Sequence, residues 1–246
     1  MKFDVIGDVH GCYDELHALF TDLGYERKNG IPYHPDKRTP VFLGDITDRG
    51  PKSIKTIDFV NRIVMEEKVG RYVPGNHCNK LYRYFLGNNV QISHGLETTV
   101  AEFQALSKDR QAQVKKQFVE LYEQADLYES IPEVNAIVAH AGIREDLIGR
   151  KDKETAVFVL YGDITGKSHD DGRPERRDWA QDYHSDRWIV YGHTPVKEAR
   201  RINQTINIDT GCVFGNKLTA FRLPEETLTA VPSQQPYIEE KFKYFE

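Results

Sequence analysis

The stretch FDVIGDVHG, residues 3–11, opens as a β-rich run and ends in a polar cluster that sets Asp8 and His10 between glycines. The arrangement recurs in PVFLGDITDRG, residues 40–50, and RYVPGNHCN, residues 71–79. Shorter versions follow in AHAG, residues 139–142, and YGHTP, residues 191–195. Glycine lets a backbone turn sharply and approach a ligand, so each cluster is predicted to form a functional loop after a strand.

Amphipathic helical patterns separate the first three strands. The run 13–24 spaces its apolar residues at i, i+3, i+4 and i+7, at Leu16, Leu19, Phe20 and Leu23, with Gly24 as its stop. A second helix is predicted to begin at Pro51. Strand and helix alternation predicts parallel strands joined by right-handed crossovers, with functional loops at their carboxyl ends.

The second half carries a different pattern. Residues from about 96 to 128 are helical in periodicity and are predicted to form a helical insertion. Short strands are then predicted within 136–142, 187–193, 205–211 and 218–223, forming a second sheet of mostly local pairings that packs face to face on the first. The polar, turn-rich run 166–179 is predicted to be an exposed loop.

Length and composition favour one folded domain. The chain has 246 residues, of which 39% are hydrophobic and 29% charged, enough for a sizeable core. We therefore expect a single domain over residues 1–246, of α/β (α+β) class, with two packed mixed β-sheets flanked by helices.

Net charge and cysteine content limit the kinds of partner and the cellular location that we expect. A net charge of −5 disfavours long nucleic acid as the main partner. The sequence has no apolar run near the ~20 residues that a membrane span needs. Three cysteines without zinc-type pairing indicate free thiols in a reducing compartment, so a cytoplasmic location is expected. The oligomeric state is left open.

The polar clusters together predict a metal centre, although each alone would more often be a hydrogen-bonded structural feature. The candidate ligands are Asp8, His10, Asp45, Asn76, His140 and His193. A mixed carboxylate, amide and imidazole set suits two divalent transition ions better than Ca²⁺. The donor set alone does not choose among them; nickel or manganese is the expectation, with iron, zinc or cobalt as alternatives. Asp45 is the candidate bridge, with Asp8 and His10 on one ion and the other three residues on the second.

Such a pair of ions suits phosphate chemistry, because the attacking and phosphoryl oxygens both carry negative charge. Two cations about 3.5–4 Å apart can hold a bridging hydroxide and clamp a phosphoryl group for in-line displacement. The sequence therefore predicts a metal-dependent phosphohydrolase.

The ordered motifs GDVHG, GDITDRG and GNH, followed by His140 and His193, resemble the phosphoprotein-phosphatase branch of the calcineurin-like metallophosphoesterases. VPGNHCNKLYRY, LYGDITG, RRDWA, VYGHTPV and NIDTGCVFG resemble its PrpE-type members, the asymmetrical bis(5′-nucleosyl)-tetraphosphatases. The phosphatase domain of bacterial polynucleotide kinase-phosphatase is also similar. The resemblance spans nearly the whole chain and implies the calcineurin-like fold and the same six ligands.

The resemblance also implies an activity and further roles. Diadenosine tetraphosphate would be cleaved to AMP and ATP by attack of the bridging hydroxide, and GTP is a nucleotide that such a site could accept. Asp48 and His77 would form a general-acid dyad, and Arg49 would hold phosphoryl oxygens. Asp209 could fix a histidine ligand or be a plain turn carboxylate, and Arg177 is the pick for a second phosphate contact, although a solvated loop face is the alternative.

Two rival functions stay open from sequence. One is a phosphatase of the same superfamily that acts on phosphoproteins or on phosphate ends of nucleic acid. The other is a catalytically silent, nucleotide-binding regulator, which the retained His77, Asp48 and Arg49 disfavour. Cys78 stands where an acidic residue is usual in the branch, which weakens the inference to protein-phosphatase activity.

Overall fold

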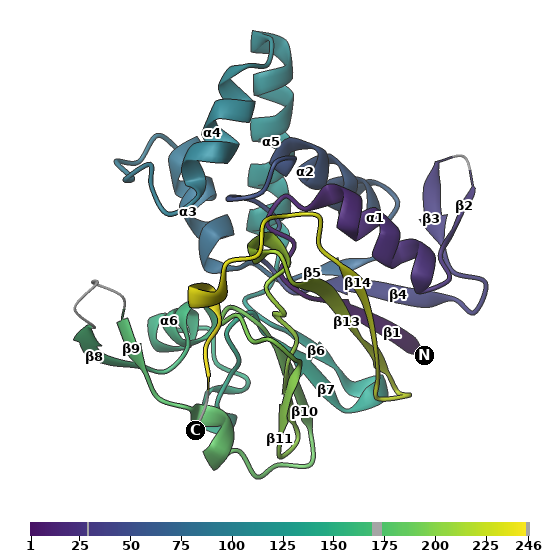
Figure 1. The fold of residues 1–246 in the computed structure, drawn as a ribbon, viewed down its shortest axis with the longest axis vertical. Helices are drawn as coiled ribbons and strands as arrows, with labels where there is room; N and C mark the ends of the chain where they lie inside the picture. Colours follow the sequence, from purple (N-terminus) through teal and green to yellow (C-terminus); the bar gives the residue numbers. More distant parts are fainter. Residues whose placement is uncertain (29, 169–173, 245–246) are drawn as a thin grey trace.

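Two five-stranded sheets form the centre of the computed structural model, which describes residues 1–28, 30–168 and 174–244. The first sheet has the strand order β14-β13-β1-β4-β5 (Figure 1). Its strands are β1 (Lys2–Ile6), β4 (Arg38–Phe42), β5 (Arg71–Tyr72), β13 (Lys217–Leu223) and β14 (Thr227–Pro232).

The predicted parallel arrangement of the first three strands is confirmed. Strand β1 pairs in parallel with β4, and β4 with β5. The connecting helices are α1 (Tyr13–Asp22) and α2 (Ser53–Asn61), the latter continued by a π-helical turn, η1 (Arg62–Glu66). Helix α1 buries Leu16, Leu19 and Phe20 on one face, as their spacing predicts, and the chain turns at Gly24, where φ is +92°. The carboxyl ends of the three strands therefore meet at one edge.

The second sheet has the order β11-β12-β10-β7-β6. Its strands are β6 (Glu129–Ile131), β7 (Ala136–Val138), β10 (Trp188–Tyr191), β11 (Arg200–Ile202) and β12 (Thr205–Asn207). The prediction of mostly local pairings was wrong in two respects. Strands β7, β10 and β12 pair in parallel, and the run 218–223 belongs to the first sheet, where β13 pairs antiparallel with β1.

The two sheets pack face to face, as predicted. A shared apolar core contains Phe3, Val5 and Val41 of the first sheet together with Val138 and Val190 of the second. The rings of Trp188 and Phe221 join the sheets at a centroid distance of 5.1 Å. Because side chains in such a core interdigitate closely, the two sets of strand ends are held in a fixed relation.

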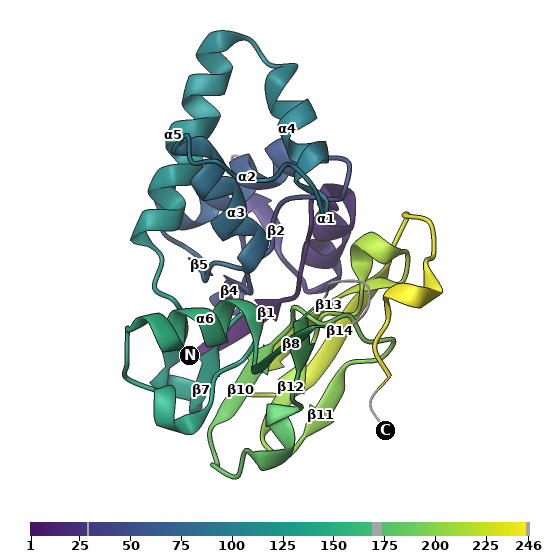
Figure 2. The ribbon, with the colours of Figure 1, turned by 90° about the vertical axis from the view of Figure 1, so that its left-hand side faces the viewer.

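Three further helices are α3 (Asn76–Phe85), α4 (Leu96–Gln104) and α5 (Lys108–Gln124). The last two form one end of the molecule, away from β11 (Figure 2). Both fall within the predicted insertion. Helix α5 begins at its cap Ser107, whose side chain accepts a hydrogen bond from the Arg110 amide, and buries Val114, Phe118 and Leu121.

Other elements were missed or misassigned. The run predicted as an exposed loop overlaps an antiparallel pair, β8 (Ile164–Ser168) with β9 (Pro174–Arg176), and its residues 169–173 lie outside the described residues. The hairpin β2 (Glu26–Lys28) with β3 (Ile31–Tyr33) and helix α6 (Lys153–Tyr161) were not predicted. The 3₁₀ turns are η2 (Pro132–Val134), η3 (Glu145–Leu147), η4 (Trp179–Asp182), η5 (Cys212–Phe214) and η6 (Glu239–Lys241). Among the described residues, no helix is long and apolar enough to cross a membrane.

Candidate active site

The loops that follow five strands bring the predicted ligands to one place. Asp8 and His10 follow β1, Asp45 follows β4, Asn76 follows β5, and His140 and His193 follow β7 and β10. Burial is nearly complete for most of them, with exposed fractions of 3% for Asp8, 1% for Asp45 and 0% for His140. Buried charges need compensation, so this cluster is unlike an ordinary set of surface loop residues.

Backbone strain gathers at the same loops. Left-handed φ values occur at His10 (45°), Asp45 (36°), Asp48 (75°) and His193 (69°). Each costs a non-glycine residue on the order of 1 kcal/mol or more, and such residues cluster at functional sites. Gly75 serves a different purpose, because a Cβ there would lie 2.1 Å from Asp45 Oδ1. Only glycine leaves room for that carboxylate.

One group of donor atoms comes from Asn76, His140 and His193. Asn76 Oδ1 lies 3.0 Å from His140 Nε2 and 2.9 Å from His193 Nδ1, and the two ring nitrogens are 3.2 Å apart. His140 Nδ1 faces the Leu43 carbonyl oxygen at 3.1 Å. A carbonyl oxygen only accepts, so the Nδ1 of His140 carries a proton and its Nε2 is directed to the group.

This group fits a cation. His193 Nε2 is buried without a hydrogen-bond partner among the described residues. Burial lowers the pKa of His140, yet the carboxylates of Asp45 and Asp8 raise it to about 9. The pocket thus draws a positive charge to this point, and a divalent ion would supply that charge in place of the proton.

A second group surrounds His10 and Asp45. His10 Nδ1 lies 2.8 Å from the Thr47 carbonyl oxygen, so the proton is on Nδ1 and Nε2 is directed inward, 3.7 Å from Asp45 Oδ2. The same Asp45 oxygen is 3.3 Å from His140 Nε2. One carboxylate oxygen therefore lies between the two groups, where a bridging ligand belongs.

The two carboxylates differ in electrostatic surroundings. Burial would raise the pKa of Asp45, but the imidazoles of His140 and His77 hold it well below its ordinary value. Burial and the neighbouring Asp209 raise the pKa of Asp8 well above its ordinary value, despite His140 Nδ1 at 3.8 Å from its Oδ2. Asp8 therefore lacks part of the positive charge that a buried carboxylate requires, which a nearby ion would provide.

His77 and Asp48 form a buried pair beside these groups. His77 Nδ1 donates to Asp48 Oδ2 at 2.7 Å, and the Thr99 hydroxyl donates to Asp48 Oδ1 at 2.8 Å. The ring of His77 lies edge-on to that of His10, with centroids 4.9 Å apart. His77 also has a ring nitrogen within 4.8 Å of ligand atoms of His10 and Asp45, so its place alone would also allow metal ligation. The contact with Asp48 favours the role in proton transfer, because a carboxylate stabilises imidazolium.

Arg49 borders the His10 side of the site. Its Nη1 donates to His10 Nε2 at 2.9 Å, and its guanidinium lies over the Phe214 ring at 5.5 Å. One nitrogen lone pair cannot serve both an arginine and a metal ion. Metal binding at His10 therefore requires Arg49 to release Nε2, which would leave this guanidinium edge for another acceptor such as a phosphoryl oxygen.

The two weaker candidates lie nearby with different contacts. Arg177 Nη1 donates to Asp163 Oδ1 at 3.0 Å, and both residues line the same cavity as His193. The Asp209 carboxylate accepts from the Gly211 amide at 3.0 Å, a turn contact, and burial raises its pKa to about 6. Within the described ranges, no histidine donates a hydrogen bond to the Asp209 carboxylate.

Some residues of the site escaped the sequence reasoning. Thr99 lies on α4, 51 residues from Asp48, and no motif marks it.

The thiols of Cys12 and Cys212 lie within 4.8 Å of each other and of the Glu15 carboxylate, all buried. Cys78 is fully buried, which raises its pKa to about 12, so it acts as packing rather than as a reactive thiol.

The arrangement is that of a metal-dependent phosphoesterase, and comparison agrees: a calcineurin-like phosphoesterase model matches residues 1–197, and the chain belongs to that family. Relatives named bis(5'-nucleosyl)-tetraphosphatase PrpE [asymmetrical] are similar over their whole length. That of Oceanobacillus iheyensis is 60% identical, covering 100% of this chain and 98% of its own. That of Geobacillus sp. WCH70 is 59% identical, covering 100% of both.

A solved structure has the same fold. It is presented as that of a candidate diadenosine tetraphosphatase and superposes with a TM-score of 0.67 at 22% identity, covering 94% of this chain and 93% of its own.

Proposed function

We propose that this protein hydrolyses dinucleoside tetraphosphates asymmetrically, converting diadenosine tetraphosphate to AMP and ATP. The observation that carries the hydrolytic part is the pair of donor groups that share Asp45, with the His77 and Asp48 pair beside them. The names of full-length relatives at about 60% identity support the choice of substrate.

Two divalent transition ions, when bound, would supply Lewis-acid charge and an activated water. Asn76, His140 and His193 would hold one, Asp8 and His10 the other, and Asp45 both. Nickel or manganese is proposed first, and elemental analysis of the purified protein tests that choice.

The chain's own groups would divide the remaining work. Arg49 would bind phosphoryl oxygens through its guanidinium fork and oppose the charge that develops on them. His77 would hold a proton, stabilised by Asp48, and donate it to the leaving oxygen. Thr99 and the Asp48 backbone, which donates to both Thr99 Oγ1 and Ser53 Oγ, would keep the carboxylate in place. Arg177 would contact a second phosphate, and Asp209 would help to orient a histidine ligand.

The wider setting is part of the same proposal. The substrate is a small nucleotide, the location is the cytoplasm, and residues 1–246 act as one domain with the helical insertion contributing Thr99.

Product analysis tests the proposal. Diadenosine tetraphosphate incubated with the metal-loaded enzyme should yield AMP and ATP in equal amounts by ion-exchange chromatography. Asp45→Asn should lose both products and bound metal, whereas Asp36→Asn, at an exposed surface pair with Lys2, should keep both. ADP as the sole product, or full activity in Asp45→Asn, would contradict the assignment.

A further inference from the structure

The C-terminal segment, residues 237–243, returns to the site after β14. Its Ile238 amide donates to the Phe214 carbonyl at 3.1 Å, and its Lys243 amide donates to the Pro195 carbonyl at 2.8 Å. Pro195 lies two residues after the candidate ligand His193. The Phe214 ring lies beneath the Arg49 guanidinium. In Figure 1 this segment, in yellow, runs down to the chain end marked C. Backbone contacts therefore attach it to both sides of the site.

An aromatic anchor fixes the segment. Phe242 is 6% exposed and stacks on Tyr237 with ring centroids 5.4 Å apart. It lies against Gly211, where φ is +66° and where a Cβ would come within 2.4 Å of the Phe242 ring. Burial of a ring of this size stabilises the segment, so it is a packed part of the fold rather than a loose tail.

Lys243 follows this anchor and lines a cavity next to the metal site. The cavity is also lined by His193, Arg176 and Arg177. Its volume is about 30 Å³, room for about two waters, since one needs ~10–15 Å³ by this measure. That is too small for a nucleoside but suits the oxygens of one phosphate group.

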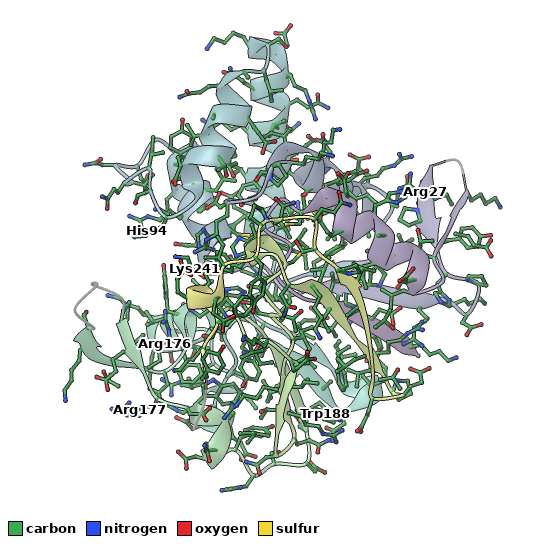
Figure 3. The ribbon with its side chains drawn as sticks, in the orientation of Figure 1. Arg27, His94, Arg176, Arg177, Trp188 and Lys241 are labelled. Atoms are coloured by element: carbon green, nitrogen blue, oxygen red, sulfur yellow. The ribbon has the colours of Figure 1, made fainter. Side chains whose placement is uncertain are left out.

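The charge of the cavity is biased toward anions. Its two lining carboxylates each hold an arginine: Asp163 with Arg177 at 3.0 Å, and Asp178 with Arg200 at 3.0 Å. Arg176 is oriented by a hydrogen bond from its Nε to the Tyr161 carbonyl. Partial loss of solvent lowers the pKa of Lys243; Asp178 opposes this, whereas Arg176 and Arg200 add to it. Positive charge is therefore concentrated here, and Figure 3 shows Arg176 and Arg177 on the side of the molecule where Lys241 of the same segment lies.

We propose that Lys243 is a specificity-determining residue that binds a phosphate beyond the one attacked, so that the C-terminal segment selects a polyphosphate chain over a single phosphate. This inference rests on the proposed function for the identity of the substrate. His193 lines the same cavity as Lys243, so in this proposal the phosphate next to the attacked one reaches the cavity, whereas a monoester has no second phosphate to place there. A charged amine at the cavity mouth then contributes only to chains.

Calorimetric titration with inorganic tripolyphosphate and with orthophosphate tests this by binding, independently of the formation of AMP and ATP. In Lys243→Gln the affinity for tripolyphosphate, divided by the affinity for orthophosphate, should fall about tenfold. This is the size expected for loss of one charge-assisted hydrogen bond. Lys243→Arg should retain most of the preference. Lys241→Gln is the matched control, since it removes the same charge from an exposed lysine two residues earlier.

An unchanged ratio in Lys243→Gln, or an equal fall in Lys241→Gln, would overturn the assignment. Failure of the proposed function is distinguishable, because it would appear as absent AMP and ATP from the wild-type enzyme while the tripolyphosphate preference and its loss persisted. The KM for diadenosine tetraphosphate should rise with the same factor in Lys243→Gln, with kcat changed far less.

Discussion

Replacing Asp48 by asparagine tests the general-acid pair most directly. The two carboxylate oxygens have separate tasks, since Oδ2 accepts from His77 Nδ1 and Oδ1 from the Thr99 hydroxyl. An asparagine side chain has one acceptor oxygen, so it can serve only one of these donors and faces the other with its NH₂ group. The change removes a charge and leaves a mismatch in a side chain that is 0% exposed.

The magnitude follows from the loss of that contact. A hydrogen bond to a charged group contributes roughly 1.5–3 kcal/mol, and about 1.4 kcal/mol corresponds to a factor of ten in rate. Because the Asp48 carboxylate orients the His77 ring through this contact, kcat should fall by about 10- to 100-fold. Metal content should stay at the wild-type level, because Asp48 is outside the two donor groups.

A series of aryl phosphate esters provides the assay. Loss of a general acid slows a phenyl ester, whose leaving oxygen is basic, much more than a dinitrophenyl ester, whose leaving oxygen needs no proton. Asp14→Asn, at an exposed pair with Lys52, is the control for removal of one carboxylate. Equal losses across the series in Asp48→Asn would refute the acid role of His77, and so would full activity on the phenyl ester.

Two further substitutions probe packing and charge. Gly75→Ala should lower metal content by elemental analysis, because its Cβ would lie 2.1 Å from Asp45 Oδ1. Gly87→Ala is the control: its φ of +83° strains an alanine, but its Cβ would meet no atom within 4 Å beyond its chain neighbours, so the metal should be kept. Wild-type metal content in Gly75→Ala would contradict the close approach. Hydrogen bonds from Arg38 lower the pKa of Glu225 from 4.5 to about 2. Its contribution to the free energy of unfolding is therefore present above pH 4.5 and lost as pH falls toward 2. Because the side chain is 37% exposed, Glu225→Gln should remove less than about 1 kcal/mol of that pH dependence in urea unfolding, and an identical pH dependence in both proteins would count against the pair.

The sequence was informative wherever structure follows from local pattern. Apolar spacing predicted α1, and alternation of strand and helix predicted the parallel β1, β4 and β5. It failed where pairing joins distant segments. Strand β13 pairs with β1, matching Phe3 with Leu223, and its sequence resembles any half-buried strand. Strand pattern gives burial of a face but not the identity of the neighbour.

The same limit applies to the site. Glycine-flanked polar clusters after strands predicted the six candidate ligands, and the parallel order of the first three strands predicted that four of them share one edge. The parallel pairing of β7 with β10, which brings His140 and His193 to the same place, was not predicted. Thr99 and Lys243 carry no such mark, since one lies in an ordinary helical pattern and the other among exposed residues near the end of the chain.

By itself, then, the sequence predicted the candidate chemistry: which atoms could bind cations, which imidazole has a carboxylate partner, and that β1, β4 and β5, which carry four of the six candidate ligands, run in parallel. Tertiary structure alone decided which distant groups support that chemistry. Helix α4 directs Thr99 to Asp48, and the anchor Phe242 sets Lys243 beside the cavity. The physical reason is that ligand motifs are local in sequence, whereas the packing of helices and of a returning segment depends on surfaces that exist only after the two sheets have assembled.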